Sequence, residues 1–376
     1  MALIGVSGEW MFLSCGTKLI AAHIKQDRSR RDEKMLPFQH RKGQRFSKKE
    51  PFVFDCSTAK KRENDPKTDD NSLAGTTGSD VILAFIISPS GKLVALTDDS
   101  KRLILLQYEH SWQCVSTRWL VRRGTSLVFN RAEDEVLVAD KSGDVYSFSV
   151  MQPEREGELK MGHLSMILAV AVSPNDKYIV TADRDEKIRV SHLCSPHSIQ
   201  SFCLGHKEFV SSLLVPSGDL HWLLSGSGDG TMKLWEYTTG QKLKSWDLND
   251  LEETLVPKTE NEGKVTVCHI TSSSDGRHIA VQCDRVSCFY CETATSELKR
   301  VTEIFKPHWV TLDASTRAAG RFVHLHKVTF DNMTVYMNKK QQRLEEQQQK
   351  RKMEQGNNGK KARKEVLGTV TAFSST

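Results

Sequence analysis

A segment that repeats itself is the feature that most limits how this chain can fold. Residues 161–193 and 204–237 each begin near a Gly-His pair and continue through an apolar stretch to a turn. A second strand, a turn containing aspartate and a third strand then follow. Repetition at roughly 40–45 residues is typical of β-propellers, in which each repeat is one four-stranded blade. The repeat therefore predicts an all-β propeller, a fold that more often offers partners a docking platform than an active site.

The same period continues outside these two copies. Short stretches rich in β-branched and aromatic residues recur between Gly and Pro, for example at 83–87, 136–139 and 145–150, as expected of strands. The turns after the first strand of successive units are 42, 43 and 42 residues apart. They lie at Ser88-Pro89, Asn130-Arg131, Ser173-Pro174 and Val215-Pro216, with a further turn at Ser274-Asp275 after a longer gap.

These turns define five units, and we expect a sixth from the N-terminus, where residues 11–13 and 52–54 resemble strands. Residues 295–327 are too few for a further complete blade and a closing strand. The sequence therefore predicts a WD-repeat β-propeller and leaves the closure of its ring open.

The Gly-His and Asp positions have a structural explanation. In WD-type blades a His, a Ser or Thr, a turn Asp and a Trp form a buried hydrogen-bond chain, which satisfies polar groups inside the sheet stack. The second copy supplies this set with His206, Ser225, Asp229 and Trp235.

The first copy departs from that pattern. It contains His163, Thr181 and Asp185, but Ser191 stands where the Trp would be. We therefore expect an incomplete hydrogen-bond chain in this unit, which leaves the turn at 183–187 less committed to holding its own blade.

An enzymatic interpretation of the same residues is disfavoured. His206, Ser225 and Asp229 are the residue types of a hydrolase triad, but the repeat explains all three and the chain has no G-x-S-x-G elbow. The glycines of 226–230 lie in a strand–turn–strand and not before a helix, so they do not form a nucleotide-binding loop. A metal site at the CxxC of 288–291 is disfavoured because residues three apart in a strand face opposite sides. We expect no catalytic, cofactor-binding or metal-binding residues.

Composition favours a soluble intracellular protein. Hydrophobic residues make up 38% of the chain, enough for one large core, and no apolar run is long enough to span a membrane. Nine cysteines are scattered singly through predicted strands, which suits reduced thiols in the cytosol or nucleus. The first 16 residues lack a basic lead and include Glu9, which argues against a signal peptide.

The net charge of +6 is concentrated in two segments. Residues 25–50 and 339–365 each contain ten Lys or Arg and four Asp or Glu, so the remainder of the chain is net acidic. Basic segments of this kind neutralise nucleic-acid phosphates. They also occur as solvated tails and as nuclear-import signals, and charge alone leaves these alternatives open.

The second basic segment has the pattern of a helix. Asp331 can cap a helix over about 332–353, in which Met333, Met337 and Leu344 form a short apolar stripe. The basic residues that we expect to reach a partner are Lys339, Lys340, Arg343, Lys350, Arg351 and Lys352. The predicted organisation is a propeller at 1–327, with a basic insertion at 25–50 and polar loops at 57–80 and 248–264, then a basic helix at 328–355 and a disordered tail at 356–376.

Several strings are more specific than the generic repeat: LVALTDDSKRLILL, LVADKSGDVYSFSV, GHLSMILAVAVSP, TADRDEKIRVS, SFCLGHKEFVS, SGDGTMKLWEY and VTFDNMTVYMNKK. Through these strings the chain resembles the WD-repeat, non-catalytic subunit of the tRNA (guanine-N7-)-methyltransferase, densely over about 80–240 and again at 327–345. It implies a seven-bladed propeller without an active site. It also implies a separate catalytic subunit that binds S-adenosylmethionine and methylates a variable-loop guanosine of tRNA.

The resemblance also implies where partners bind. The blade turn that holds Asp185, Glu186, Lys187 and Arg189 would meet the catalytic subunit, and the basic C-terminal helix would lie close to the tRNA. The chain itself would bind no cofactor and no membrane, and we expect it in the nucleus, with the cytoplasm as a second compartment.

Two features depart from this family. The chain after Glu292 is short by most of a blade, and the insertion at 25–50 is longer than expected. A general WD-repeat adaptor, such as a ubiquitin-ligase substrate receptor or a chromatin-associated scaffold, is the alternative function, because the fold alone does not distinguish them.

Overall fold

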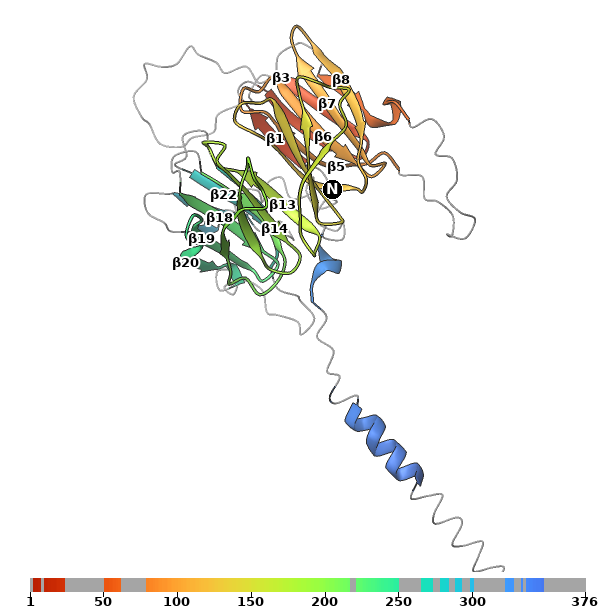
Figure 1. Ribbon diagram of the computed structural model, residues 1–376, viewed down its shortest axis with the longest axis vertical. Helices are drawn as coiled ribbons and strands as arrows, with labels where there is room; N and C mark the ends of the chain where they lie inside the picture. The colour runs from red at the N-terminus through yellow and green to blue at the C-terminus, as the bar shows by residue number, and fades with distance from the viewer. Residues whose placement is uncertain are drawn as a thin grey trace, which may run out of the picture. The chain divides into compact units, whose positions relative to one another are not determined.

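Six four-stranded antiparallel sheets account for nearly all of the regular structure in the computed structural model (Figure 1). The structure describes residues 3–7, 10–23, 51–61, 79–216, 221–249, 265–272, 278–283, 288–292, 298–300, 322–327, 333 and 336–347. The chain divides into two units, Met1–His326 and Lys327–Thr376. All six sheets belong to the first unit, and the predicted boundary after residue 327 lies one residue beyond the observed one.

In each sheet, every strand pairs with the next strand along the chain. The first sheet contains β1 (Leu3–Ser7), β2 (Trp10–Cys15), β3 (Lys18–His23) and β4 (Phe52–Asp55), followed by the short 3-10 helix η1 (Cys56–Thr58). The second contains β5 (Ile82–Ile87), β6 (Leu93–Asp98), β7 (Arg102–Tyr108) and β8 (Trp112–Trp119). The third contains β9 (Gly124–Phe129), β10 (Glu135–Asp140), β11 (Asp144–Ser149) and β12 (Glu158–Gly162).

The remaining three sheets continue in the same way. The fourth contains β13 (Ile167–Val172), β14 (Tyr178–Asp183), β15 (Ile188–His192) and β16 (Ile199–Cys203). The fifth contains β17 (Val210–Leu214), β18 (Trp222–Ser227), β19 (Thr231–Glu236) and β20 (Gln241–Asp247). The sixth contains β21 (Val267–Ser272), β22 (His278–Cys283), β23 (Cys288–Glu292) and β24 (Leu298–Arg300).

This arrangement confirms the predicted units. The strands predicted at 83–87, 136–139 and 145–150 are β5, β10 and β11, and the N-terminal unit is the first sheet. A seventh sheet is not among the described residues. The insertion at 25–50, residues 62–78 of the predicted loop at 57–80, residues 250–264 of the predicted loop at 248–264 and the predicted tail at 356–376 also lie outside them.

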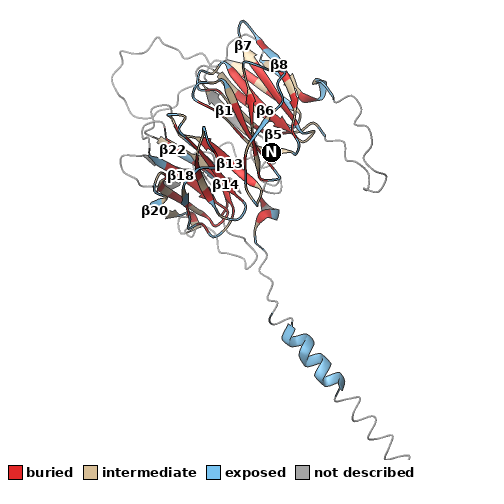
Figure 2. Ribbon diagram, in the orientation of Figure 1, coloured by how far each residue is buried: buried red, intermediate tan, exposed pale blue. Residues whose placement is uncertain are grey.

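The core lies between successive sheets. Five apolar clusters each join one sheet to the next, and the buried residues follow the strands (Figure 2). Both faces of a sheet are therefore covered, so that β6 and β14 are buried along their whole length. Trp235, which has no exposed surface, fills the space between the fourth and fifth sheets beside Val190.

Hydroxyl side chains also join the first strands of neighbouring sheets. Thr125 and Ser211 both occupy β-bulges, where the register of the strand shifts by one residue. The bulge turns each hydroxyl outward, where it donates to the next sheet. Thr125 Oγ1 donates to the carbonyl of Ile167 at 2.7 Å, and Ser211 Oγ donates to the carbonyl of Val267.

A second kind of link joins the turns after the first strands. The Glu133 carboxylate accepts a hydrogen bond from the backbone and the hydroxyl of Ser90 in the preceding sheet. One sheet later, the Asp176 carboxylate accepts from the backbone N–H groups of Arg131 and Ala132. Both carboxylates belong to residues with a left-handed backbone, at φ +58° and +52°. The same bracing device therefore recurs with the period of the repeat.

Residues 322–326 also lie against the sheets. The 3-10 helix η4 (Val323–Leu325) is flanked by Phe322 and His326, whose rings lie 5.6 Å and 5.0 Å from the ring of Phe209. His326 Nε2 also lies 3.1 Å from Thr266 Oγ1. This segment therefore packs against the beginnings of the first strands of the fourth, fifth and sixth sheets.

The second unit contains the predicted C-terminal helix. Its described part is helical at 333 and over 336–347, and every described side chain in it is exposed (Figure 2). Met333, Met337 and Leu344, the predicted apolar stripe, are exposed as well, together with Tyr336. The other residues of the predicted helix lie outside the described residues.

Candidate functional site

The buried hydrogen-bond set of the fifth sheet is complete. His206 Nε2 lies 2.7 Å from Ser225 Oγ, which also accepts a hydrogen bond from Trp235 Nε1 at 2.8 Å. His206 Nδ1 lies 3.0 Å from Asp229 Oδ2. The loop before β17 is thus tied to the turn between β18 and β19.

The same geometry argues against a hydrolase. Ser225 is fully buried and its hydroxyl is engaged by Trp235 and His206, so it cannot approach a substrate. Burial lowers the pKa of His206 below its ordinary value, in spite of the neighbouring carboxylate of Asp229. Burial alone would raise the pKa of Asp229, but its hydrogen bonds from His206 and Thr231 outweigh this and hold the pKa well below its usual range. The set is a neutral His locked to an ionised Asp.

In the fourth sheet the prediction of Asp185 as the turn carboxylate is wrong. His163 Nε2 lies 2.7 Å from Thr181 Oγ1, as the pattern predicts, but His163 Nδ1 lies 3.0 Å from Oδ2 of Asp183. Asp183 is the last residue of β14 and is buried, whereas Asp185 is exposed. The signal for this was in the repeat, because the second strands of three successive sheets end in aspartate: Asp98, Asp140 and Asp183.

As expected, the hydrogen-bond set of the fourth sheet lacks the indole donor that Trp235 supplies to Ser225 in the fifth sheet. Arg189 Nε donates instead to Oγ of Ser191, the residue at the Trp position, at 3.1 Å. The other ends of the guanidinium donate to the carbonyls of Gly162 at 3.1 Å and Pro196 at 2.9 Å. Arg189 therefore ties its own sheet to the end of β12 in the third sheet, while its side chain stays only partly buried.

The turn at 183–187 is rigid and strongly polar. Oδ1 of Asp183 accepts hydrogen bonds from the backbone N–H groups of Asp185 at 2.9 Å and Lys187 at 3.0 Å. The side chains of Asp185 and Lys187 are exposed and that of Glu186 is half-buried. A fixed backbone therefore presents charges of both signs to solvent.

Glu186 has an unusual backbone for its residue type. Its φ is +71°, and the neighbouring sheets place Gly143 (φ +96°) and Gly230 (φ +78°) at the corresponding point of the turn. A left-handed conformation costs an L-residue about 1–2 kcal/mol that glycine does not lose. Residues held in such conformations cluster at functional sites, so Glu186 is a candidate for a side chain kept for binding.

Two exposed leucines lie beside this turn, and no pattern in the sequence pointed to either. Leu164 is fully exposed in the loop between β12 and β13, next to His163. The same loop is tied to the turn, because the Arg184 N–H donates to the Met166 carbonyl at 2.9 Å. Leu204 is 62% exposed and follows Cys203, which pairs with Ile188 across β15 and β16. The turn edge therefore combines apolar and charged side chains.

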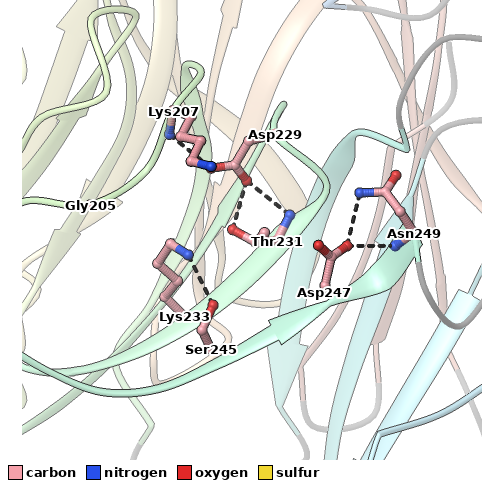
Figure 3. Close-up of a pocket in the computed structure, with 8 residues that line it drawn as sticks. All are labelled: Gly205, Lys207, Asp229, Thr231, Lys233, Ser245, Asp247 and Asn249. Carbon is pink, nitrogen blue, oxygen red and sulfur yellow. Dashed lines mark hydrogen bonds between the residues drawn. The ribbon is translucent and has the colours of Figure 1, made fainter.

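The corresponding edge of the fifth sheet contains a pocket (Figure 3). Its walls come from the loop before β17, the turn between β18 and β19, and strands β19 and β20. The lining residues are Gly205, Lys207, Asp229, Thr231, Lys233, Ser245, Asp247 and Asn249. Lys233 is buried, and its ammonium donates to Ser245 Oγ at 2.9 Å (Figure 3).

Comparison with known proteins identifies the family. The family model described as the tRNA methyltransferase TRM82 WD40 domain matches residues 14–161 and 149–354. The chain belongs to this family. It is 44% identical over 405 residues to the zebrafish tRNA (guanine-N(7)-)-methyltransferase non-catalytic subunit wdr4, covering 92% of each chain. It is 40% identical over 344 residues to the human subunit WDR4, covering 77% of this chain and 82% of that one.

A solved structure supports the fold alone. A chain of the crystal structure of a mitotic checkpoint complex superposes with a TM-score of 0.56 at 13% identity, covering 80% of this chain and 77% of that chain. The chain is accordingly an all-β, WD-repeat β-propeller with a C-terminal helix.

The structure also describes part of the predicted tRNA-contacting helix. Of the predicted tRNA-contacting residues, Lys339, Lys340 and Arg343 lie on the exposed helix, and Lys350, Arg351 and Lys352 fall outside the described residues. Among the residues that the structure describes, no cluster of three His, Cys, Asp or Glu is arranged to hold a metal ion. In that same part of the chain, no helix has the length and apolar character needed to cross a membrane.

Proposed function

We propose that this chain is the non-catalytic subunit of a tRNA (guanine-N(7)-)-methyltransferase, a scaffold that stabilises and orients a separate catalytic subunit. The observation that carries the proposal is the match to the zebrafish non-catalytic subunit over 92% of both chains. The family model also reaches residue 354, so the similarity includes the C-terminal helix as well as the sheets. S-adenosylmethionine binding, methyl transfer and recognition of the guanosine for variable-loop methylation then belong to the partner.

We further propose that the catalytic subunit docks on the turn edge of the fourth sheet. Asp185, Glu186 and Lys187 present mixed charges on a turn that Asp183 fixes, and Arg189 follows two residues later, bonded to the carbonyls of Gly162 and Pro196. Fixed charges of both signs set the orientation of a partner and exclude wrong ones. Leu164 supplies an exposed apolar side chain beside them, which matches the usual combination of an apolar centre with a polar rim.

The left-handed backbone of Glu186 offers a direct test of this docking surface. Glu186→Gly removes the charge and relieves the conformation at φ +71°. We expect the isolated chain to gain about 1 kcal/mol of stability and to bind the catalytic subunit about tenfold more weakly. Chemical denaturation gives the first quantity, and calorimetric titration with the purified catalytic subunit gives the second.

A matched control exists in the second sheet. Lys101 has the same left-handed backbone, at φ +63° in the turn between β6 and β7. Lys101→Gly should stabilise the chain in the same way without changing the affinity for the catalytic subunit. Wild-type affinity in Glu186→Gly would show that the partner docks elsewhere.

The basic C-terminal helix is proposed to aid tRNA docking. Lys339, Lys340 and Arg343 are exposed on it, and basic side chains position nucleic acid through phosphate contacts without reading bases. Truncation after Asn338 removes ten Lys or Arg. It should weaken tRNA binding by the complex while leaving the two subunits together.

The salt dependence of tRNA affinity measures these contacts. Each lost phosphate contact should flatten the slope of log K against log salt by about 0.7–0.9. An unchanged slope in the truncated complex would assign RNA binding to the partner or to residues 25–50.

We also propose that the protein is located in the nucleus, with the cytoplasm as a second compartment. The two basic segments support this proposal, because such segments act as nuclear-import signals.

A further inference from the structure

A buried ammonium lines the pocket at the turn edge of the fifth sheet (Figure 3). The Lys233 side chain is only 6% exposed, and its ammonium donates one hydrogen bond, to Ser245 Oγ at 2.9 Å. An ammonium has three donors. None of the carboxylates that the structure describes forms an ion pair with it. Lys233 therefore carries a desolvated charge with hydrogen-bonding capacity that the described residues leave unused.

One acidic residue of the pocket, Asp229, is committed elsewhere. Oδ2 of Asp229 lies 3.0 Å from His206 Nδ1 and accepts from the backbone N–H of Lys207 at 2.9 Å. Oδ1 accepts from the backbone and the hydroxyl of Thr231 at 2.9 Å and 2.6 Å. Asp229 is thus held in place by four partners and cannot turn toward the ammonium.

The second acidic residue is also engaged, since Oδ1 of Asp247 accepts from the backbone and side chain of Asn249 (Figure 3). Burial lowers the pKa of Lys233. The nearby Lys242 and Lys207 lower it further, against the opposing effect of the two carboxylates. The surroundings as a whole therefore disfavour the charged form, and an added anion would stabilise it.

The fourth sheet shows what a satisfied cation at this position looks like. Arg189 pairs with Thr181 across β14 and β15, as Lys233 pairs with Ser225 across β18 and β19, so the two cations occupy equivalent positions. Arg189 donates to three acceptors within the chain, Ser191 and Pro196 in its own sheet and its following loop and Gly162 at the end of β12 in the third sheet. Lys233 has one. The difference points to an acceptor for Lys233 that comes from another molecule.

The position of Lys233 connects it with the proposed docking surface. On β19 it shares a face with Trp235 and Tyr237, which pack toward the fourth sheet. It also lies two residues beyond the turn between β18 and β19, the counterpart of the turn at 183–187. The pocket therefore continues the charged edge of the fourth sheet onto the fifth.

We propose that this pocket receives an acidic side chain, Asp or Glu, of the catalytic subunit, which pairs with Lys233 and with the exposed Lys207 at the rim. This inference rests on the proposed function, because the partner is the one proposed there. A carboxylate supplies the acceptors that the ammonium lacks, and the low exposure of Lys233 makes the pair strong and weakly screened by salt. The pocket thus adds a second, inward-facing contact to the surface charges at 185–187.

The test is the affinity of the purified catalytic subunit for the Lys233→Met chain, measured by calorimetric titration. We expect binding about thirtyfold weaker than that of the wild-type chain, the effect of losing a desolvated charge pair. The unfolding midpoint of the isolated Lys233→Met chain should equal or exceed that of the wild type, because Met removes a buried charge. Wild-type affinity in Lys233→Met would overturn the proposal.

Further variants separate a role of Lys233 in pairing from a role in folding or in RNA binding. Lys177→Met, on the opposite edge of the fourth sheet, should bind like the wild type.

If Lys233→Met destabilises the chain, a charge swap between the two subunits tests the pairing independently of stability. Lys233→Glu should bind poorly and be rescued by an Asp or Glu changed to Lys in the catalytic subunit, and failure of every such rescue would overturn the pairing. A loss confined to tRNA affinity would assign the pocket to phosphate and also overturn it. If the wild-type chain does not bind the catalytic subunit at all, the proposed function itself fails.

Discussion

The fourth and fifth sheets are built from the same repeat, yet they solve the same structural problem with different residues. In both, a His after the preceding strand bonds to a hydroxyl and to a carboxylate at nearly equal distances. The carboxylate is Asp229 in the middle of the turn in one sheet and Asp183 at the end of the strand in the other. Ser227 occupies the position equivalent to Asp183 and caps the backbone N–H of Asp229 instead.

The difference shows that the arrangement in space is maintained while its place in the sequence shifts by two residues. A carboxylate can reach the His from either position because the turn folds back over the strand end. The two turns therefore differ in what they expose to solvent. Asp185 is exposed in the fourth sheet, whereas Asp229 is buried in the fifth. The fourth sheet can therefore present a charged turn, and the fifth presents a pocket.

The largest expected effect comes from converting one sheet into the other at the Trp position. Trp235→Ser should lower the free energy of unfolding by about 3–5 kcal/mol, because it leaves a large cavity between the fourth and fifth sheets. Ser225 also loses its indole donor. Urea denaturation followed by circular dichroism measures the change. A loss below about 1 kcal/mol would mean that Trp235 contributes no more to the free energy of unfolding than Ser191 does at the equivalent position of the fourth sheet.

The reassignment of the carboxylate in the fourth sheet predicts a clear contrast. Asp183→Ala should cost about 2–3 kcal/mol, because buried His163 loses its partner and two backbone N–H groups of the turn lose their acceptor. Asp185→Ala, at an exposed position, should change stability by less than about 0.5 kcal/mol. Thermal unfolding of the two variants side by side checks this, and the reverse order would restore Asp185 as the structural residue.

The two equivalent cations should differ in their effect on stability. Arg189→Met removes three hydrogen bonds, two within the fourth sheet and one to Gly162 of the third, and should cost about 1–2 kcal/mol. Lys233→Met removes a single bond and a desolvation penalty, and should be neutral or slightly stabilising. Equal losses in chemical denaturation would mean that both cations serve their own sheets alike.

The smallest effect concerns the pH response of the fifth sheet. Burial holds the pKa of His206 below its ordinary value of 6.5. The unfolded chain therefore takes up this proton first as the pH falls. The stability contributed by the neutral ring is complete above about pH 6.5 and is lost below it. NMR titration of the ring should give a pKa below 6.5, and the unfolding midpoint of His206→Gln should fall less steeply with pH than that of the wild type. A pKa above 6.5 would show that the charged form is the one stabilised.

The sequence by itself determined the repeat, the strands and the pairing of His with hydroxyl and carboxylate. These follow from local rules, because apolar runs bounded by Gly, Pro and Asp turns specify strands wherever they occur. The N-terminal sheet and the six units were predicted correctly for this reason. The basic residues of the C-terminal helix were equally visible, since charge is a property of composition.

Tertiary structure decided which of several similar residues takes each role. Asp183 and Asp185 differ by two positions in a turn, and only the folded turn shows which one meets His163. Arg189 has the sequence pattern of a surface charge, but its guanidinium bonds to the carbonyls of Gly162, at the end of the third sheet, and of Pro196, in the loop after β15. The exposure of Leu164, the strained backbone of Glu186 and the burial of Lys233 likewise depend on what neighbouring sheets cover. Local sequence patterns specify the strands and turns. Which of several similar side chains bonds to a given buried partner depends on how the sheets pack.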